Sequence, residues 1–418
     1  MSIEQNQARK PPAPDAVVTF LMLFVAIAFI NNGFGDNSTG VLWQPVTWYL
    51  KASLGWSAEQ IAKYMTVLAL PWMIMPVYPL FAMFLPIFGF RFKPYLFIAS
   101  SLGLLAALIL VFVEMPSLII IGLFMASLGA AMITALAGAV LVENGKRLSI
   151  NKSLVNSQWI WYWGATALAG VLGGALAGLL TPAGSFHAAA VVYGLAPLFM
   201  LAGTWWLLPS EEPSQIDLAG FKSSLQALVA TFKIPVLWLM SLFVFFLAFG
   251  PSSGTAMVQY YLPDHLHFSE QFIGVLFGIA AAGSVVGGML YAWLYKRVST
   301  KRMLYLSILL CVAASCANVL MVGPKTAMLL YFVNGITNML ATVEALALAA
   351  NYCPDKAEGF AYAILISVIY AAWQLSDNVG SVLYTFTNQN MTPLFLISAA
   401  STAVCLAFLP FLKLPDKT

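Results

Sequence analysis

Long apolar runs separated by short polar loops make up most of this sequence. Within each run the hydrophobic residues follow one another without alternating, a pattern typical of buried helices and not of half-buried strands. A helix needs about 20 residues to cross the hydrocarbon layer of a bilayer. The pattern therefore predicts twelve membrane-spanning helices, at residues 17–49, 57–84, 94–113, 115–142, 153–181, 184–208, 235–262, 271–295, 303–323, 326–351, 358–386 and 391–412.

The first run is long for a single span. A polar, glycine-containing stretch, residues 31–40, lies at its centre. Glycine and asparagine both weaken a helix interior. We expect one long irregular helix here, because a re-entrant pair of short helices would need a turn within the same stretch.

Composition points to lipid as the solvent. Hydrophobic residues make up 61% of the chain and charged residues 8%, whereas soluble domains carry roughly 25% charged residues. In lipid every backbone polar group must be satisfied internally, which leaves helices or closed barrels. With continuous apolar runs, the expected class is an all-α integral membrane protein.

The basic residues indicate how the chain is oriented. If both termini are cytoplasmic, the predicted outer loops hold only Lys51, Lys63 and Lys325, and the other 16 of the 19 Lys and Arg residues fall inside. Cytoplasmic loops are enriched in Lys and Arg. We therefore expect a multi-pass protein of the plasma (inner) membrane with both termini cytoplasmic. Topology accounts for the basic loops, so no nucleic-acid partner is expected.

The spans divide into two similar halves. Trp48-Tyr49-Leu50 recurs as Tyr260-Tyr261-Leu262, and Trp56-Ser57 recurs as Phe268-Ser269, each after 212 residues. Two six-helix halves in parallel repeat are the plan of major facilitator transporters. The predicted organisation is a cytoplasmic tail at 1–16, a six-helix bundle at 17–208, a cytoplasmic linker with an amphipathic helix at 209–234, a second bundle at 235–412 and a tail at 413–418.

Several local motifs allow a more specific prediction. Leu70 to Tyr78 reads LPWMIMPVY, and the loop Pro86 to Tyr95 reads PIFGFRFKPY. With Gly55 to Gln60, Leu141 to Glu143 and Cys353 to Gly359, these segments resemble the folate–biopterin transporter family. The resemblance implies a major facilitator fold and transport of a pterin- or folate-like solute.

Some charges of that family pattern are missing. The family has a lysine where Met75 stands, Gly-x-x-Ser-Asp where Pro79 to Met83 stand, and acidic residues near Thr134 and Gly138. In the family these charges help to gate the inner face or contact an anionic pterin. Their loss is compatible with a different substrate, a different coupling, or no transport.

Three acidic residues fall inside predicted spans without a basic partner in the membrane core: Asp36, Glu344 and Asp377. Ionisable residues in a membrane core cost about 2.5–3.5 kcal/mol on insertion scales and are by default functional candidates. A desolvated carboxyl favours its neutral form, so it can take up and release a proton during a cycle. We predict that these three residues couple transport to protons, although polar helix packing would also account for each.

Neutral polar and aromatic residues complete the candidate site. Spans one, four, five, seven, ten and eleven line major facilitator cavities, and all but span four carry such residues here. The predicted substrate-binding residues are Asn32, Trp43, Gln44, Gln158, Trp159, Trp163, Gln259, Asn334, Asn338, Gln374 and Asn378. A gate at the inner face is predicted from Glu143, Arg91 and Lys93.

The sequence therefore favours a proton-coupled secondary transporter of a small organic solute. Two alternatives remain open: a transporter-fold scaffold within a larger membrane complex, and a carrier of a cation or metal chelate. No nucleophile motif, phosphate-binding loop or metal-ligand spacing occurs, so we expect neither an enzyme nor a bound cofactor. The expected partners are the lipid bilayer, the substrate and protons.

Overall fold

The computed structural model describes residues 14–36, 39–148, 150–208, 214–217, 220, 222–223, 226, 235–295, 297–352 and 358–412. Across these ranges the regular elements are helices, and the β-type pairing is confined to an isolated bridge between Ile87 and Phe90. The predicted all-α fold class is confirmed. Residues 1–13 of the predicted N-terminal tail, the predicted C-terminal tail and most of the predicted linker helix lie outside the described residues.

The N-terminal half forms six spans, of which the first two are broken into shorter helices. Its elements are α1 (Pro14–Gly35), α2 (Trp43–Leu54), α3 (Ala58–Thr66), η1 (Val67–Ala69), α4 (Leu70–Met73), α5 (Val77–Phe84), α6 (Lys93–Phe112), α7 (Pro116–Arg147), α8 (Asn151–Leu179) and α9 (Pro182–Trp206).

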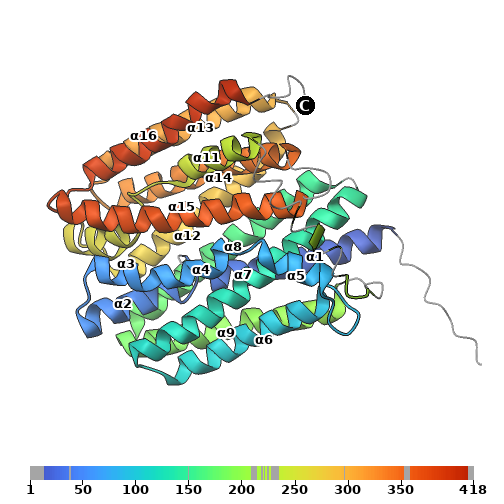
Figure 1. Ribbon diagram of the computed structural model, residues 1–418. Helices are drawn as coiled ribbons and strands as arrows, with labels where there is room; N and C mark the ends of the chain where they lie inside the picture. Colours follow the sequence, from blue (N-terminus) through green and yellow to red (C-terminus); the bar gives the residue numbers. More distant parts are fainter. Residues whose placement is uncertain are drawn as a thin grey trace, which may run out of the picture.

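The C-terminal half repeats this plan. Its elements are α11 (Pro235–Ala248), η2 (Ala256–His265), α12 (Glu270–Leu294), α13 (Thr300–Ala317), η3 (Asn318–Leu320), α14 (Pro324–Tyr352), α15 (Glu358–Phe386), α16 (Thr392–Phe408) and η4 (Leu409–Phe411). Figure 1 shows the two halves stacked with their helices roughly parallel, the C-terminal half above and the N-terminal half below.

Ten helical segments among the described residues are long and apolar enough to cross a membrane, compared with twelve spans predicted. The other two predicted spans also contain helices, but one is interrupted and the other carries polar residues. Span seven is interrupted after α11, whose apolar part covers only Pro235–Ala248. Span eleven is the continuous helix α15, and it carries Gln374, Asp377 and Asn378 at its middle.

The first span consists of two helices with a break between them, where the sequence predicted one long irregular helix. The chain passes from α1 to α2 through a turn in which the Gly40 amide donates to the Asp36 carbonyl oxygen (3.0 Å) and the Val41 amide to that of Phe34 (3.1 Å). These bonds satisfy backbone groups that the break frees inside the bundle. In Figure 1, α2 continues in the general direction of α1, so the pair makes a single crossing.

Span seven, the first span of the C-terminal half, is interrupted at the position that corresponds to the break in span one. After α11 the chain turns through Pro251 and resumes as the π-helical segment η2. A Cβ at Gly380 of α15 would collide with the Pro251 carbonyl, so glycine is needed for this close approach. Irregular backbone at membrane depth is tolerated where protein buries it or where it lines a cavity. Residues of both breaks, Thr39 in the first and Gly250 with Gly254 in the second, lie beside a cavity between the two halves.

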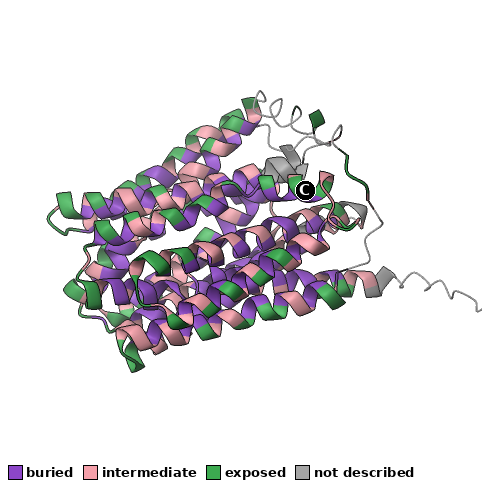
Figure 2. Cartoon of the chain, turned by 60° about the horizontal axis from the view of Figure 1, so that its bottom comes forward, coloured by how far each residue is buried: buried purple, intermediate pink, exposed green. Residues whose placement is uncertain are grey.

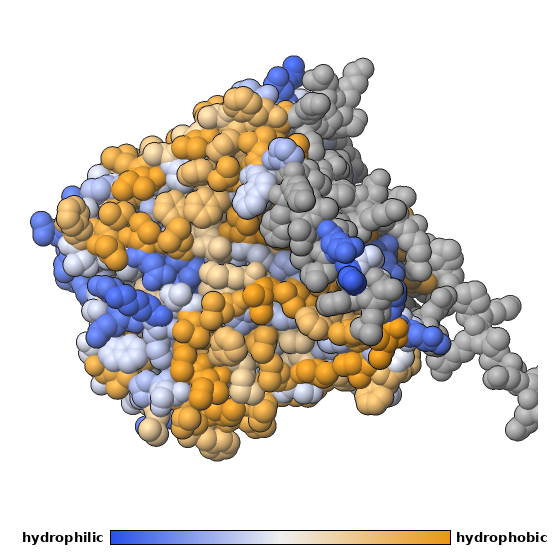
Figure 3. Space-filling model, viewed as in Figure 1, coloured by the Kyte–Doolittle hydropathy of each residue, from blue (hydrophilic) through white to orange (hydrophobic). Residues whose placement is uncertain are grey.

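The outer surface is the one expected for lipid contact. Large apolar side chains such as Phe112, Phe199 and Trp206 are exposed, while buried residues face the interior of the helix layers (Figure 2). Hydrophobic residues cover most of the face seen in Figure 3, with hydrophilic residues gathered towards its left and right ends. The beginning of α1 and the end of α16 lie at the same, right-hand end in Figure 1.

The described part of the linker packs on the N-terminal half. The Ser214 amide donates to the Gly89 carbonyl oxygen (2.9 Å), and the Asp217 amide to that of Phe84 (3.1 Å). Gly89 has a positive φ of 82° in the tight turn between α5 and α6. The beginning of the linker is thereby held against the loop that carries Arg91 and Lys93.

Candidate functional site

A cavity of about 400 Å³ lies between the two halves. Its size is that of a typical small-molecule site. Residues from α2, α3 and α8 line it on one side, and residues from α11, η2, α12, α14, α15 and α16 on the other. Large aromatic side chains form much of the wall, including Trp43, Trp163, Phe277, Tyr370, Trp373 and Phe395.

Asp377 is the acidic side chain in this wall. The break before η2 brings the Thr255 amide to 2.7 Å from one carboxylate oxygen of Asp377, and the Thr255 hydroxyl to 3.0 Å from the other. A Cβ at Gly254 would collide with the same carboxylate. The helix break thus holds Asp377 in one orientation at the edge of the cavity.

Three of the predicted amide side chains lie in the same wall. Gln374 comes from α15, one turn before Asp377, and Asn334 and Asn338 come from successive turns of α14. Asn334 donates to Asn318 (2.9 Å) and to the Leu330 carbonyl oxygen (2.7 Å). With Trp43 and Trp163, these are the predicted substrate-binding residues that the structure brings together around one space.

Asp36 lies near the cavity but does not line it. Its carboxylate accepts from the Tyr162 hydroxyl (3.0 Å) and from the Thr39 amide (3.1 Å), and the side chain is 2% exposed. Tyr162 and Thr39 themselves line the cavity. The Tyr370 hydroxyl also interacts with Asp36 and Asn32. Asp36 is therefore separated from the cavity by a layer of hydroxyl groups.

The Pro-Trp motif of span two has a structural role at the same level. The ring of Trp72 stacks on Tyr370 with centroids 4.4 Å apart, and its indole nitrogen donates to Ser127 (2.9 Å). The Pro71 carbonyl oxygen accepts from the Tyr78 hydroxyl (2.8 Å). Trp72 thus connects the N-terminal half to a residue in the cavity wall of the other half.

The other predicted site residues lie elsewhere in the fold. Asn32, Gln158 and Trp159 are buried and lie outside the set that lines the cavity. Glu344 is buried on α14 and interacts with Tyr291 of α12, within the C-terminal half. Their predicted roles in binding and coupling remain untested predictions.

Gln44, Gln259 and Asn378 join the two halves. Gln44 donates to the backbone oxygen of Glu270 (2.8 Å) and to its carboxylate (3.0 Å). Gln259 donates to the Thr47 hydroxyl (2.7 Å), and Asn378 donates to the Thr66 hydroxyl (3.1 Å). Their role in substrate binding stays a prediction.

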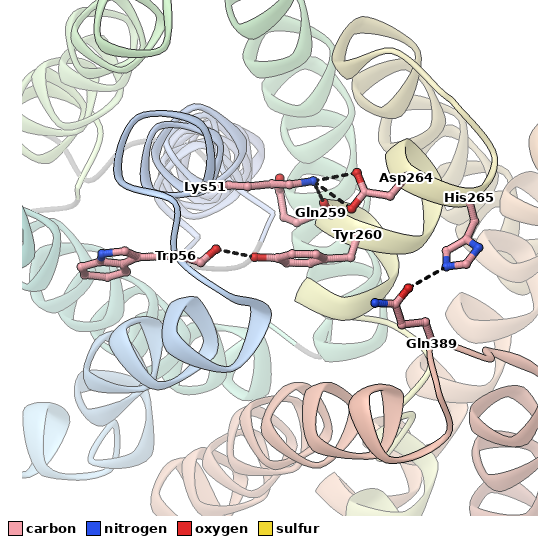
Figure 4. A network of polar contacts seen from close by, with 7 residues as sticks. All are labelled: Lys51, Trp56, Gln259, Tyr260, Asp264, His265 and Gln389. Carbon is pink, nitrogen blue, oxygen red and sulfur yellow. Dashed lines mark hydrogen bonds and ion pairs between the residues drawn. The ribbon is translucent and has the colours of Figure 1, made fainter.

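Lys51 is the centre of a contact network that sequence reasoning missed. Its ammonium group lies 3.0 Å from an Asp264 carboxylate oxygen, donates to the Gln259 carbonyl oxygen, and sits 4.6 Å from the centre of the Tyr260 ring (Figure 4). The Tyr260 hydroxyl donates to the Trp56 carbonyl oxygen (2.7 Å). We call the contacts of Gln44, Thr47 and Lys51 with Gln259, Asp264 and Glu270 the latch.

The internal sequence repeat indicates some of the contacts in the latch. Thr47 and Gln259 are 212 residues apart, the same offset as the repeated motifs, and they contact each other directly. Two halves related by a pseudo-two-fold axis bring equivalent residues together where they meet on that axis. Polar residues paired at the repeat offset were therefore candidates for contacts between the halves.

We expect Lys51→Ala to weaken the closed latch. The Lys51 side chain is 24% exposed and that of Asp264 53%, and exposed ion pairs contribute about 0.2–1 kcal/mol. The ratio of closed to open molecules should therefore fall by up to about fivefold. A double-mutant cycle with Asp264→Ala, read out by thiol labelling of a cysteine at position 253 in the cavity, measures the pair. Additive effects would show that the ion pair does not stabilise the closed state.

Glycines allow α8 and α12 to touch. Ideal Cβ atoms built at Gly174 and Gly274 would each lie 2.6 Å from the Cα of the other residue. Gly170 and Gly178 of α8 likewise face Phe277 and Gln271 of α12 at distances too short for a side chain. Small residues at such positions let membrane helices approach closely.

The predicted gate residues Arg91 and Glu143 form an ion pair of 3.1 Å. The pair joins the loop before α6 to the end of α7, both in the N-terminal half. Lys93 begins α6 nearby and also has an interaction partner. This ion pair fixes helices within one half, and a gating function for it stays a prediction.

Curated proteins of similar sequence are transporters. The chain is 24% identical over 407 residues to a folate-biopterin transporter of Synechocystis sp., covering 93% of this chain and 82% of that protein. It is 25% identical over 376 residues to probable folate-biopterin transporter 6 of Arabidopsis thaliana, covering 84% and 73%.

Solved structures show the same fold at much lower identity. A crystal structure of a D-xylose–proton symporter superposes with a TM-score of 0.72 and 13% identity, over 96% of this chain and 98% of that one. A nucleoside transporter superposes with a TM-score of 0.66 and 12% identity, over 94% and 100%. The fold is that of major facilitator transporters. The model of the BT1 family matches residues 37–415, and the chain belongs to that family of membrane transporters.

Proposed function

We propose that this protein is a secondary active transporter that moves a small organic solute of the pterin or folate type by alternating access. The observation that carries the proposal is the cavity between the two halves, together with a latch of polar contacts at one end of the molecule. Opening the latch while the other end closes would expose the same site to the opposite face.

The relatives support the choice of solute. Two of them carry the name folate-biopterin transporter, and both align with most of this chain. Aromatic walls suit planar heterocycles, which stack on them. The basic loops favour an orientation with both termini in the cytoplasm, in the plasma (inner) membrane.

Proton coupling is part of the proposal. Asp377 lines the cavity, and Thr255 is its hydrogen-bond donor. A carboxyl without a cation nearby is stable in a membrane core when it is protonated or when it contacts a donor-rich substrate. Protonation of Asp377 in one orientation and release in the other would link solute movement to the proton gradient.

Reconstituted vesicles test the proposal. Purified protein should accumulate labelled pterin or folate when a pH gradient is imposed across the membrane, and a protonophore should abolish the accumulation. Protein-free vesicles are the control for leakage. If no pterin, folate, organic cation or metal chelate crosses the membrane, the protein is a non-transporting scaffold and the proposal is wrong.

A further inference from the structure

The polar atoms that the cavity wall offers to a ligand include a set of oxygens. Each carboxylate oxygen of Asp377 receives one bond from Thr255, and a carboxylate accepts about four in total. The wall also contains the side-chain oxygens of Gln374, Asn334 and Asn338. None of these three oxygens accepts a hydrogen bond from another described residue, so they are available to a donor.

The orientation of each amide is fixed by its other contact. Asn334 and Asn338 direct their NH2 groups to backbone carbonyl oxygens, those of Leu330 (2.7 Å) and Asn334 (2.9 Å), which can only accept. Gln374 directs its NH2 group to the Thr66 hydroxyl (3.2 Å). That hydroxyl already donates to the Ala62 carbonyl oxygen (2.9 Å), so it too acts as an acceptor. The amide oxygens are therefore the groups left for a ligand.

The charge of the wall agrees with this arrangement. Among the described residues that line the cavity there is a carboxylate but no Lys, Arg or His. An anionic group entering this space would lose its hydration without gaining a counter-ion, and it would approach Asp377. A neutral N–H donor or a cation meets no such penalty.

The aromatic side chains of the wall favour a flat ligand. Trp373 packs edge-on against Tyr370, with ring centroids 5.1 Å apart, and both rings line the cavity with Trp43 and Trp163. Aromatic faces bind flat rings by stacking and also attract cations. A flat ligand with several N–H groups satisfies both the oxygens and the ring faces.

We propose that the cavity selects planar nitrogen heterocycles that are rich in N–H donors and neutral or cationic, and that it discriminates against forms carrying a carboxylate. The inference rests on the proposed transport function and narrows its substrate. Within the pterin and folate class, it predicts that the bare ring is the ligand and that glutamate-conjugated forms are poor ligands.

A pair of fluorescent probes that differ by one carboxylate tests the inference. Pterin and 6-carboxypterin share the ring, and at neutral pH the second carries an additional negative charge. Binding to the purified full chain in detergent is measured by quenching of tryptophan fluorescence, and uptake is measured in vesicles. Pterin should bind at least tenfold more tightly than 6-carboxypterin, and folic acid should compete weakly.

Adding a cation to the wall should reduce the preference. Ser253 is an exposed residue in the lining and is not one of the amide oxygens described above, so Ser253→Lys places an ammonium group in the cavity without removing a proposed ligand contact. This variant should reduce the ratio of the two affinities at least tenfold. Gln215→Lys adds the same charge at an exposed linker position and should leave the ratio unchanged. Retained pterin binding shows that a variant is folded.

The outcomes separate the two proposals. If 6-carboxypterin or folic acid binds and is transported as well as pterin, the charge selection is wrong while the transport function stands. An unchanged ratio in Ser253→Lys, with pterin binding retained, also overturns the selection. If none of the three compounds binds or crosses the membrane, the proposed pterin or folate transport fails and this inference fails with it.

Discussion

Replacing Gly174 by valine should reduce solute uptake at least about fivefold. The Gly174 Cα faces the Gly274 Cα so closely that an added Cβ would lie 2.6 Å from it. The obstacle is backbone, so no side-chain rotation relieves the clash, and α8 and α12 must separate. Overpacking of this kind costs about 1–3 kcal/mol, which corresponds to a shift of roughly 5- to 150-fold against the closed latch.

Gly164→Val is the matched control. It lies on the same helix, is exposed, and has nothing within 4 Å of its added Cβ. It makes the same change of residue type without the clash, so uptake should stay near that of the unmodified protein. A cysteine at position 253 should react faster with a membrane-impermeant thiol reagent from the latch side in Gly174→Val only. Equal uptake in the two variants would show that close contact of α8 and α12 is not part of the cycle.

Much of the fold could be predicted because membrane helices follow from local hydropathy. The repeat offset of 212 residues and the Asn-Gly-rich centre of the first span identified two halves and an irregular crossing. We expected one long irregular helix, and the structure has two helices with a break between them, because local sequence does not show how a break is satisfied. Here the carbonyl oxygens of Phe34 and Asp36 accept bonds from residues beyond the break.

The candidate site was predicted less completely, and the amides show why. Asn334, Asn338 and Gln374 line the cavity, whereas Gln44, Gln259 and Asn378 bond across the interface between the halves. A polar residue in a span needs a partner, but hydropathy does not tell whether that partner is a substrate or another helix. The answer depends on the rotation of each helix about its axis, which packing in three dimensions sets.

The same limit applies to the carboxylates. Asp36 and Asp377 occupy similar places in the sequence pattern, each in a polar stretch of an otherwise apolar span. In the fold, the Tyr162 hydroxyl donates to Asp36 and covers it on the cavity side. Asp377 lines the cavity itself and accepts a hydrogen bond from the Thr255 amide. This difference makes Asp377 the better candidate for direct coupling and predicts distinct effects of changing it.

Asp377→Asn should abolish uphill accumulation while retaining at least half of the exchange of labelled for unlabelled solute. The asparagine oxygen can still accept from the Thr255 amide, which lies 2.7 Å from Asp377, so the helix break stays in place. An amide resembles the protonated carboxyl, and it cannot release a proton. The cavity can therefore reorient with solute bound, but solute movement is no longer tied to the pH gradient.

Both activities are measured in the same vesicles, accumulation under an imposed pH gradient and exchange without one. Glu59→Gln is the control, because Glu59 is an exposed carboxylate that pairs with Lys63 on the surface of α3. That variant should retain both activities, since removing an exposed pair changes stability by about 1 kcal/mol or less. Loss of exchange together with accumulation in Asp377→Asn would assign the carboxylate to binding. Normal accumulation would mean that the proton is carried elsewhere, with Asp36 behind its tyrosine hydroxyls as the next residue to change.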